Sequence, residues 1–328
     1  MLSLDLKNPP CFGGSVEVVR LFMKSYMQFF NTLVARAVPM MPHALVRKIS
    51  RRYIAGDNLN LAIDRIRQLN AQGYSVTIDV LGEVASSPED ALRTVDEYTQ
   101  VLHAISTHRL SASISVKPTA LGMLINSTEC AKYIEELARL AQVYKTSICI
   151  DMEDTRCTQD EIDLFNHLRS RYSNVSLALQ AYLNRTYQDI EPLLLTKSEL
   201  RICKGIYVEN RIHLVKDAWK DRAAINQHFL NHVERCCAAG SFVAVATHDV
   251  RLIEQVIALA KQQAIAPTAF EFQMLLGVCE ALRDRLQSEG FHVRVYLPYG
   301  EDWYGYSTRR IKENPSIAGY ILKSLLQR

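Results

Sequence analysis

The feature that most constrains the fold is an alternation of short apolar runs with amphipathic segments after Gly56. The apolar runs are rich in β-branched residues, which is typical of strands covered on both faces. They span residues 74–83, 111–118, 147–154, 176–183, 200–207, 242–249, 269–275 and 293–300. Segments with apolar residues at helical spacing separate them, among them 89–107, 128–144, 159–171, 217–239 and 252–263. Because parallel strands need crossover connections, this order predicts a parallel sheet.

Eight strand–helix units predict an α/β fold, specifically a (βα)8 TIM-type barrel. An open, doubly wound sheet remains the alternative. No low-complexity linker interrupts the alternation, so we expect residues 57–328 to form one catalytic barrel domain. Residues 1–56 are expected to form an N-terminal helical segment that packs on it. Charged residues interrupt the apolar stretch 16–41, which predicts an amphipathic helix that packs on the domain rather than one that spans a bilayer. A helix that lies on a membrane surface or binds a partner is the alternative.

Charge and cysteine usage narrow the class of protein. The formal net charge of +3 is too small to indicate a nucleic-acid partner. The eight cysteines form no CxxC motif, and we interpret them as buried, reduced thiols of a cytosolic protein. His228 and His232 are four residues apart on a helical segment. With no third ligand evident in the sequence nearby, we expect a solvated helix face there and no metal site.

Polar residues gather where the predicted strands end. In a barrel the carboxyl ends of the strands converge on one mouth, where catalytic groups collect. Buried charges need partners, so we expect these residues to form a paired, partly buried network. They are Glu83, Lys117, Asp151, Glu153, Asp154, Gln180, Arg201, Lys204, Tyr207, Thr247, His248, Glu271, Gln273 and Tyr296.

The last predicted strand leads into residues 302–313, which carry two adjacent arginines. If this segment is helical, Asp302, Tyr306, Arg310 and Glu313 share a face and Arg309 lies beside them. The planar guanidinium fork suits a carboxylate, to which it can donate two parallel hydrogen bonds. A solvated arginine pair on a surface helix is the alternative.

The same residues carry a family resemblance. The matching motifs are VKPTALG (Val116–Gly122), IDMED (Ile150–Asp154), LQAYLNRT (Leu179–Thr186), LRICKGIY (Leu200–Tyr207), ATHD (Ala246–Asp249), FEFQMLLGV (Phe270–Val278) and PYGEDWYGYSTRRIKENP (Pro298–Pro315). With these motifs in order, the chain resembles the proline dehydrogenase family, in its compact monofunctional bacterial type. The similarity runs from about Tyr53 to Asn314.

The resemblance implies a distorted (βα)8 barrel whose final helix sits over the mouth. It implies a flavoprotein that uses FAD to oxidise L-proline to 1-pyrroline-5-carboxylate, the first step of proline catabolism to glutamate. The electrons then pass to a membrane quinone. The resemblance thus implies a cytoplasmic protein, and it leaves open peripheral contact with the inner face of the cell membrane and assembly into an oligomer.

The resemblance also assigns roles to residues. Lys117, Arg309 and Arg310 would hold the substrate carboxylate, with Glu313 paired to an arginine. Asp151 and Arg201 would be catalytic, Asp151 by orienting the arginines and Arg201 by lying near the reactive edge of the flavin. Tyr296 and Tyr306 would wall the substrate ring. The residues implied in FAD binding are Met152, Gln180, Arg201, Lys204, Gly205, Ile206, Thr247, His248 and Gln273.

Three other functions remain open on the sequence. A lysine at a barrel mouth can form a Schiff base, so Lys117 or Lys204 could serve a lyase or aldolase. Hydroxyproline is the competing substrate for a flavin enzyme of this kind. The barrel could also be a non-catalytic binding scaffold. No GxGxxG motif follows a predicted strand, which disfavours a Rossmann dinucleotide fold.

Overall fold

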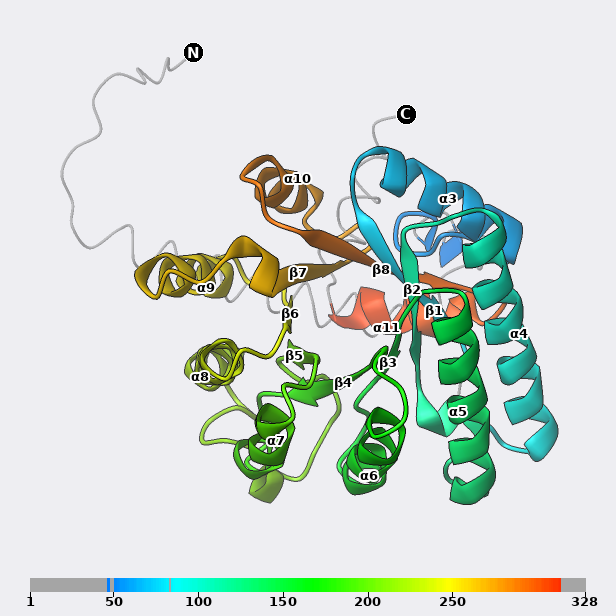
Figure 1. The fold of residues 1–328 in the computed structure, drawn as a ribbon, viewed down its shortest axis with the longest axis horizontal. Helices are drawn as coiled ribbons and strands as arrows, with labels where there is room; N and C mark the ends of the chain where they lie inside the picture. Colours follow the sequence, from blue (N-terminus) through cyan, green and yellow to red (C-terminus); the bar gives the residue numbers. More distant parts are fainter. Residues whose placement is uncertain (1–45, 48–49, 83, 314–328) are drawn as a thin grey trace, which may run out of the picture. The chain divides into compact units, whose positions relative to one another are not determined.

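The computed structural model describes residues 46–47, 50–82 and 84–313. Contacts divide the chain into two compact units, and the larger one spans Arg51–Trp303. In that unit eight strands close into a barrel in chain order, and β8 returns to pair with β1. Every strand pair is parallel (Figure 1). The predicted (βα)8 barrel is therefore confirmed, and the open sheet is wrong.

Each strand matches one predicted apolar run. The strands are β1 (Ser75–Val80), β2 (Ala112–Val116), β3 (Ile148–Ile150), β4 (Val175–Gln180), β5 (Leu200–Cys203), β6 (Val243–Ala246), β7 (Phe270–Leu275) and β8 (Val293–Tyr299). Most end earlier than predicted, because the polar residues after them already belong to the loops of the barrel mouth.

Helices surround the strands as an outer layer (Figure 1). They are α3 (Leu59–Ala71), α4 (Pro88–Thr107), α5 (Ser127–Val143), α6 (Thr158–Arg169), α7 (Thr186–Leu195), α8 (Asn226–Ala238), α9 (Val250–Gln262) and α10 (Glu280–Ser288). The predicted helix 217–239 is wrong before Asn226. Asp217 adopts a left-handed backbone with φ of 66°, and the Asp221 side chain accepts from the Ala223 amide at 2.8 Å, which caps a short 3-10 turn instead.

The strands are buried on both faces, with large apolar residues on the outward face and polar or small residues on the inward face. In β1, Val76, Ile78 and Val80 alternate with Thr77 and Asp79. The inward residues of neighbouring strands pair in register, for example Thr77 with Ser113 and Asp79 with Ser115 of β2. The same alternation holds in β5 and β7, where Arg201, Glu271 and Gln273 occupy inward positions. The barrel therefore has an apolar shell under its helices and a polar interior.

Tyr98 connects this helical layer to the barrel mouth. It is fully buried on α4. Its hydroxyl donates to the Ser115 carbonyl at 2.6 Å and accepts from the Val80 amide at 3.3 Å. Two strand ends are thus held by one helix immediately before Lys117.

The second unit contains the described residues 46–47, 50 and 304–313. Helix α11 (Trp303–Glu313) confirms the helix predicted at 302–313. Within this unit the Ser50 hydroxyl lies 2.7 Å from Ser307 Oγ and 2.7 Å from the Val46 carbonyl. The predicted helix at 16–41 lies outside the described residues. The division at residue 56 and the placement of the final helix over the mouth stay predictions.

Two further features concern the described part of the chain. None of its helices combines the length and the apolar character that crossing a bilayer requires. Its cysteines are free thiols. Cys130, Cys149, Cys157 and Cys236 are buried as expected, whereas Cys203 and Cys237 are half-buried and Cys279 is exposed.

Replacing Tyr98 by Phe tests the connection between α4 and the barrel. The ring still fits, but two buried backbone groups lose their partner, which should cost about 1–3 kcal/mol of unfolding free energy. Urea unfolding measures it, with Tyr133→Phe on the half-exposed face of α5 as the control. A Tyr98→Phe protein as stable as the control would contradict this role.

Candidate active site

The site is built around the carboxylate of Asp151, directly after β3. Its backbone amide donates to the Val116 carbonyl at 2.9 Å, which extends the β2–β3 ladder and fixes the residue. The side chain accepts from Ser115 Oγ at 2.8 Å and from Tyr296 Oη at 2.7 Å, and it pairs with Arg201 Nη1. Partners from β2, β5 and β8 thus converge on one carboxylate.

Lys117 provides the exposed cation of this cluster. It follows β2, and its ammonium pairs with Asp79 and lies 3.9 Å from Asp151 Oδ2. Burial alone would lower the pKa of Lys117, but Asp79 and Asp151 raise it above its ordinary value. Burial raises the pKa of Asp79, although Lys117 opposes that shift. Lys117 therefore remains positively charged at neutral pH, and its side chain is 28% exposed.

Arg201 is the buried cation. We predicted it at the end of a strand, but it is the second residue of β5. Its long side chain nevertheless reaches the mouth. Nη1 donates to Ser115 Oγ at 2.9 Å and Nε donates to Gln273 Oε1 at 2.6 Å. The guanidinium carbon lies 5.4 Å from the centre of the Tyr296 ring. The cluster thus holds two cations and two carboxylates in one network.

A second group of polar side chains lies after β5 and β6. Lys204 Nζ donates to Asp249 Oδ2 at 2.7 Å, and the Asp249 amide donates to Thr247 Oγ1 at 3.2 Å. His248 Nε2 accepts from the Leu275 amide at 2.9 Å. These contacts fix the loops after two adjacent strands and bring an ammonium, a hydroxyl and an imidazole together.

The loop after β5 depends on Gly205. Its φ is 100°, and a Cβ atom there would lie 2.2 Å from the Tyr182 ring. Its carbonyl accepts from Arg222 Nη2 at 2.6 Å. Ile206 follows with 48% of its surface exposed. The loop therefore makes a tight turn that leaves an apolar side chain open at this end of the barrel.

A buried pair of acids holds the loop after β3. The Glu153 carboxylate accepts from the Thr119 amide at 2.8 Å and from its hydroxyl at 2.6 Å. The Glu153 amide donates to Glu161 at 3.0 Å, and its carbonyl accepts from Gln180 Nε2 at 2.8 Å. Met152, between Asp151 and Glu153, is buried. Burial, and then the nearby Glu153, raise the pKa of Glu161 to about 9.

The structure joins five of the predicted site residues in one network, and some of the others lie outside the described part of the chain. Lys117, Asp151, Arg201, Gln273 and Tyr296 form one network of hydrogen bonds and ion pairs. Tyr306 belongs to the second unit. Arg309, Arg310 and Glu313 lie on α11, but their side chains are outside the described part, as is Glu83.

The sequence analysis did not predict Asp79 and Ser115, which bond to members of this network, or Glu161, which holds the loop after β3. It also missed Arg294, which pairs with Glu271. Asp79 was hidden because the run SVTIDV looks like one apolar strand. A carboxylate in such a run, two residues from Thr77, is the signal that the inward face is polar.

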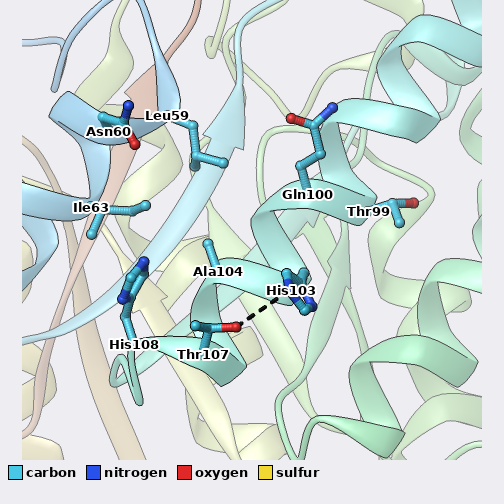
Figure 2. Close-up of a pocket in the computed structure, with 9 residues that line it drawn as sticks. All are labelled: Leu59, Asn60, Ile63, Thr99, Gln100, His103, Ala104, Thr107 and His108. Carbon is cyan, nitrogen blue, oxygen red and sulfur yellow. Dashed lines mark hydrogen bonds between the residues drawn. The ribbon is translucent and has the colours of Figure 1, made fainter.

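Two other locations are separate from this network. His232 was expected on a solvated face, but it is fully buried against Tyr187, with ring centroids 4.5 Å apart. A hollow lies between α3 and α4 on the outside of the barrel (Figure 2). Leu59, Ile63 and His103 are among its lining residues, and none of the predicted site residues is.

Comparisons with known proteins agree on one family. The family model described as proline dehydrogenase matches residues 62–321. Proline dehydrogenase 2 of Bacillus subtilis is 37% identical, covering 86% of this chain and 92% of that protein. Proline dehydrogenase of Deinococcus radiodurans is 31% identical, covering 85% and 90%.

A solved structure shares the fold. Proline utilization A of Bdellovibrio bacteriovorus, inactivated by N-propargylglycine, superposes with a TM-score of 0.74 at 20% identity. The match covers 82% of this chain but only 33% of that one, so the chain spans about a third of this larger protein.

Replacing Glu161 by Gln tests the buried acid pair. The folded protein keeps the Glu161 proton up to about pH 9, whereas the unfolded chain loses it near pH 4.5. Since the raised pKa belongs to an acid, the parent loses stability as pH rises through this window. Gln keeps the acceptor oxygen and cannot ionise.

We therefore expect the stability of Glu161→Gln relative to the parent to increase between pH 5 and pH 9. The gain should be on the order of 1–3 kcal/mol by pH 8. Urea unfolding at several pH values measures it, with Asp163→Asn on the exposed face of α6 as the control. A difference that is constant with pH would show that Glu161 is ionised in the folded protein.

Proposed function

This chain belongs to the proline dehydrogenase family, and we propose that it oxidises L-proline to 1-pyrroline-5-carboxylate with FAD as its cofactor. The observation that carries the proposal is the cation Lys117, held at the barrel mouth between Asp79 and Asp151. A partly exposed ammonium in that position suits a small substrate with a carboxylate. This reaction is the first step of proline catabolism to glutamate.

The substrate carboxylate is proposed to bind Lys117 together with Arg309 and Arg310. The two arginines follow one another on α11, and Glu313 on the same helix is proposed to pair with one of them. Tyr296 and Tyr306 are proposed to wall the ring. The bond from Tyr296 Oη to Asp151 supports this role, because it leaves the tyrosine ring little freedom to rotate.

The donors at the ends of β5 and β6 fit FAD. A flavin with its pyrophosphate presents mostly acceptors and negative charge. Arg201 on β5 carries donors, and so do Lys204, Thr247 and His248 directly after β5 and β6. The turn at Gly205 and the exposed Ile206 add an apolar surface beside these donors. Met152, Gln180 and Gln273 are proposed to complete the cofactor site. In this structure the Gln180 and Gln273 amides also bond to neighbouring groups of the chain.

FAD supplies the acceptor for two electrons when it is bound. To form the C=N bond of the product, proline must lose a hydride from the ring carbon that is next to nitrogen and carries no carboxylate, and a proton from nitrogen to water. The cations on the carboxylate fix the ring in one orientation, which is catalysis by proximity. Arg201 is proposed to stabilise the negative charge that develops at the cofactor edge, and Asp151 holds that guanidinium in place.

The structure gives a reason against the lyase or aldolase alternative. A Schiff base requires a neutral amine, but the raised pKa keeps Lys117 charged, and Lys204 pairs with Asp249. The non-catalytic binding scaffold predicts no flavin reduced by proline, so the spectrum of the purified protein decides that alternative. Hydroxyproline remains the competing substrate of the same chemistry.

The fate of the electrons is proposed from the family alone. We propose a membrane quinone as the acceptor, for a cytoplasmic protein that contacts the inner face of the membrane peripherally.

A spectrum of the purified protein tests the function directly. We expect flavin absorption bands, and addition of L-proline without oxygen should bleach them as the cofactor is reduced. Trans-4-hydroxy-L-proline, added to a second sample, decides between the two substrates by its bleaching rate. Flavin bands that neither compound bleaches would refute the proposal, and so would a purified protein without flavin that cannot be loaded with FAD.

Lys117→Met tests the carboxylate site. The variant keeps the length of the side chain but loses the charge, so KM for proline should rise on the order of 10- to 100-fold. The flavin content should stay unchanged, because Lys117 contacts Asp79 and Asp151 rather than the second polar group. Lys132→Met, on the exposed face of α5, is the control. An unchanged KM would exclude Lys117 as a carboxylate ligand.

A further inference from the structure

The side chain of Gln273 lies between a group that donates to its amide oxygen and a group that accepts from its amide nitrogen. On one side Arg201 Nε donates to Gln273 Oε1 at 2.6 Å. On the other side Gln273 Nε2 donates to Glu271 Oε1 at 2.7 Å. A guanidinium only donates and an ionised carboxylate only accepts. Both contacts are therefore satisfied by one orientation of the amide, and a flipped amide would lose both.

Glu271 is in turn fixed by a charge of its own. Arg294 Nε lies 2.7 Å from the same Oε1 atom that accepts from Gln273. Arg294 Nη1 also donates to the Val76 carbonyl at 3.2 Å, which attaches it to β1. The Glu271 side chain is 8% exposed, so this ion pair is part of the barrel interior. A buried carboxylate needs such a partner to stay charged.

Arg294, Glu271 and Gln273 connect the interior of the barrel with Arg201 at the mouth. Glu271 and Gln273 are two residues apart on β7, so both side chains point inward. Gln273 reaches Arg201, whose Nη1 pairs with Asp151. In this series Arg294 and Gln273 both donate to Glu271, and Arg201 donates to both Gln273 and Asp151. Because Arg201 bonds through both Nε and Nη1, the plane of its guanidinium is set from two sides.

We propose that Glu271 is a positioning residue for Arg201: it fixes the amide of Gln273 and thereby the plane of the Arg201 guanidinium. The inference rests on the proposed function, in which Arg201 lies at the cofactor edge. Glu271 itself lies deeper in the barrel, below the mouth, and acts only through Gln273. Arg294 serves as its countercharge.

Two substitutions separate this role from a merely structural one. Replacing both Glu271 and Arg294 by Leu removes the acceptor and its countercharge together. Apolar residues in place of a buried ion pair are often neutral for stability, so we expect the protein to fold. Glu271→Gln removes the charge but keeps an oxygen that can accept from Gln273. It should lose stability, because Arg294 is left without an opposite charge, and yet keep Arg201 in place.

Nuclear magnetic resonance reads the position of Arg201 without reference to activity. In the full-length protein labelled with nitrogen-15 arginine, the Nε–H signal of Arg201 is assigned by its loss in Arg201→Lys. We expect the Leu pair to shift this signal and to accelerate its exchange with water roughly tenfold or more, and Glu271→Gln to leave it near the parent values. The control replaces Glu254 and Arg285 by Leu, because these two residues form an exposed ion pair with a 2.5 Å contact.

The kinetic readout should follow the same division. The Leu pair should lower kcat for proline roughly tenfold with KM within about twofold, because Arg201 acts on the reacting edge rather than on the carboxylate. Gln273→Leu should reproduce the change in the Arg201 signal, and adding the Leu pair to it should have no further effect. Gln273→Leu also tests the role should the Leu pair fail to fold.

The outcomes are distinguishable. An Arg201 signal that keeps its parent position and exchange rate in the Leu pair, or in Gln273→Leu, overturns the inference. The inference is also overturned if Glu271→Gln loses the Arg201 signal in parallel with its loss of stability. The role of Glu271 would then be structural. If the parent is not reduced by proline, the proposed function fails, and the signal still decides whether Glu271 positions Arg201.

Discussion

The architecture of the mouth depends on the Asp151 carboxylate. A buried charge left without partners costs several kcal/mol, so every group that bonds to it is under strong constraint. Those groups come from β2, β5 and β8, and β8 meets β3 across the barrel only because the sheet closes. Closure of the barrel and assembly of the site are thus one condition: a chain that failed to pair β8 with β1 would leave Asp151 without Tyr296.

The barrel separates stability from chemistry by the two faces of its strands. Outward residues such as Ile78, Ile114 and Phe272 are fully or almost fully buried under the helices and supply the apolar core. Barrel interiors are usually filled with layers of branched apolar side chains. Here the inward positions carry Asp79, Arg201 and Glu271 among small residues, so the interior is held by charge pairs and hydrogen bonds. Such an interior is specific in geometry, because each polar group accepts only certain partners.

Much of this arrangement could be predicted from the sequence. The regular recurrence of the apolar runs predicted the number and the order of the strands, because the outward residues of each strand are apolar. The residues that follow strands, such as Lys117 and Asp151, were found because a charge next to an apolar run is conspicuous. Asp79 and Arg294 were missed because their outward neighbours make the strand look uniformly apolar. Arg201 and Glu271 also lie within strands, and they were found only because they were taken for residues at strand ends. The partners of each charge depend on the register between distant strands, which no local pattern encodes.

Arg201 and the loop that carries Lys204 belong to the same strand end, but the orientation of the Arg201 guanidinium is set separately from that loop. It lies on β5 and bonds to Asp151 in the group that contains Lys117. Two residues after it the same strand ends, and Lys204 begins the loop that turns at Gly205. The strand itself is hydrogen-bonded on both sides, so neither end can move without the other. A displacement of the Arg201 guanidinium is therefore confined to its side chain. For that reason the orientation of this group depends on the amide of Gln273 and the carboxylate of Asp151, and not on the loop.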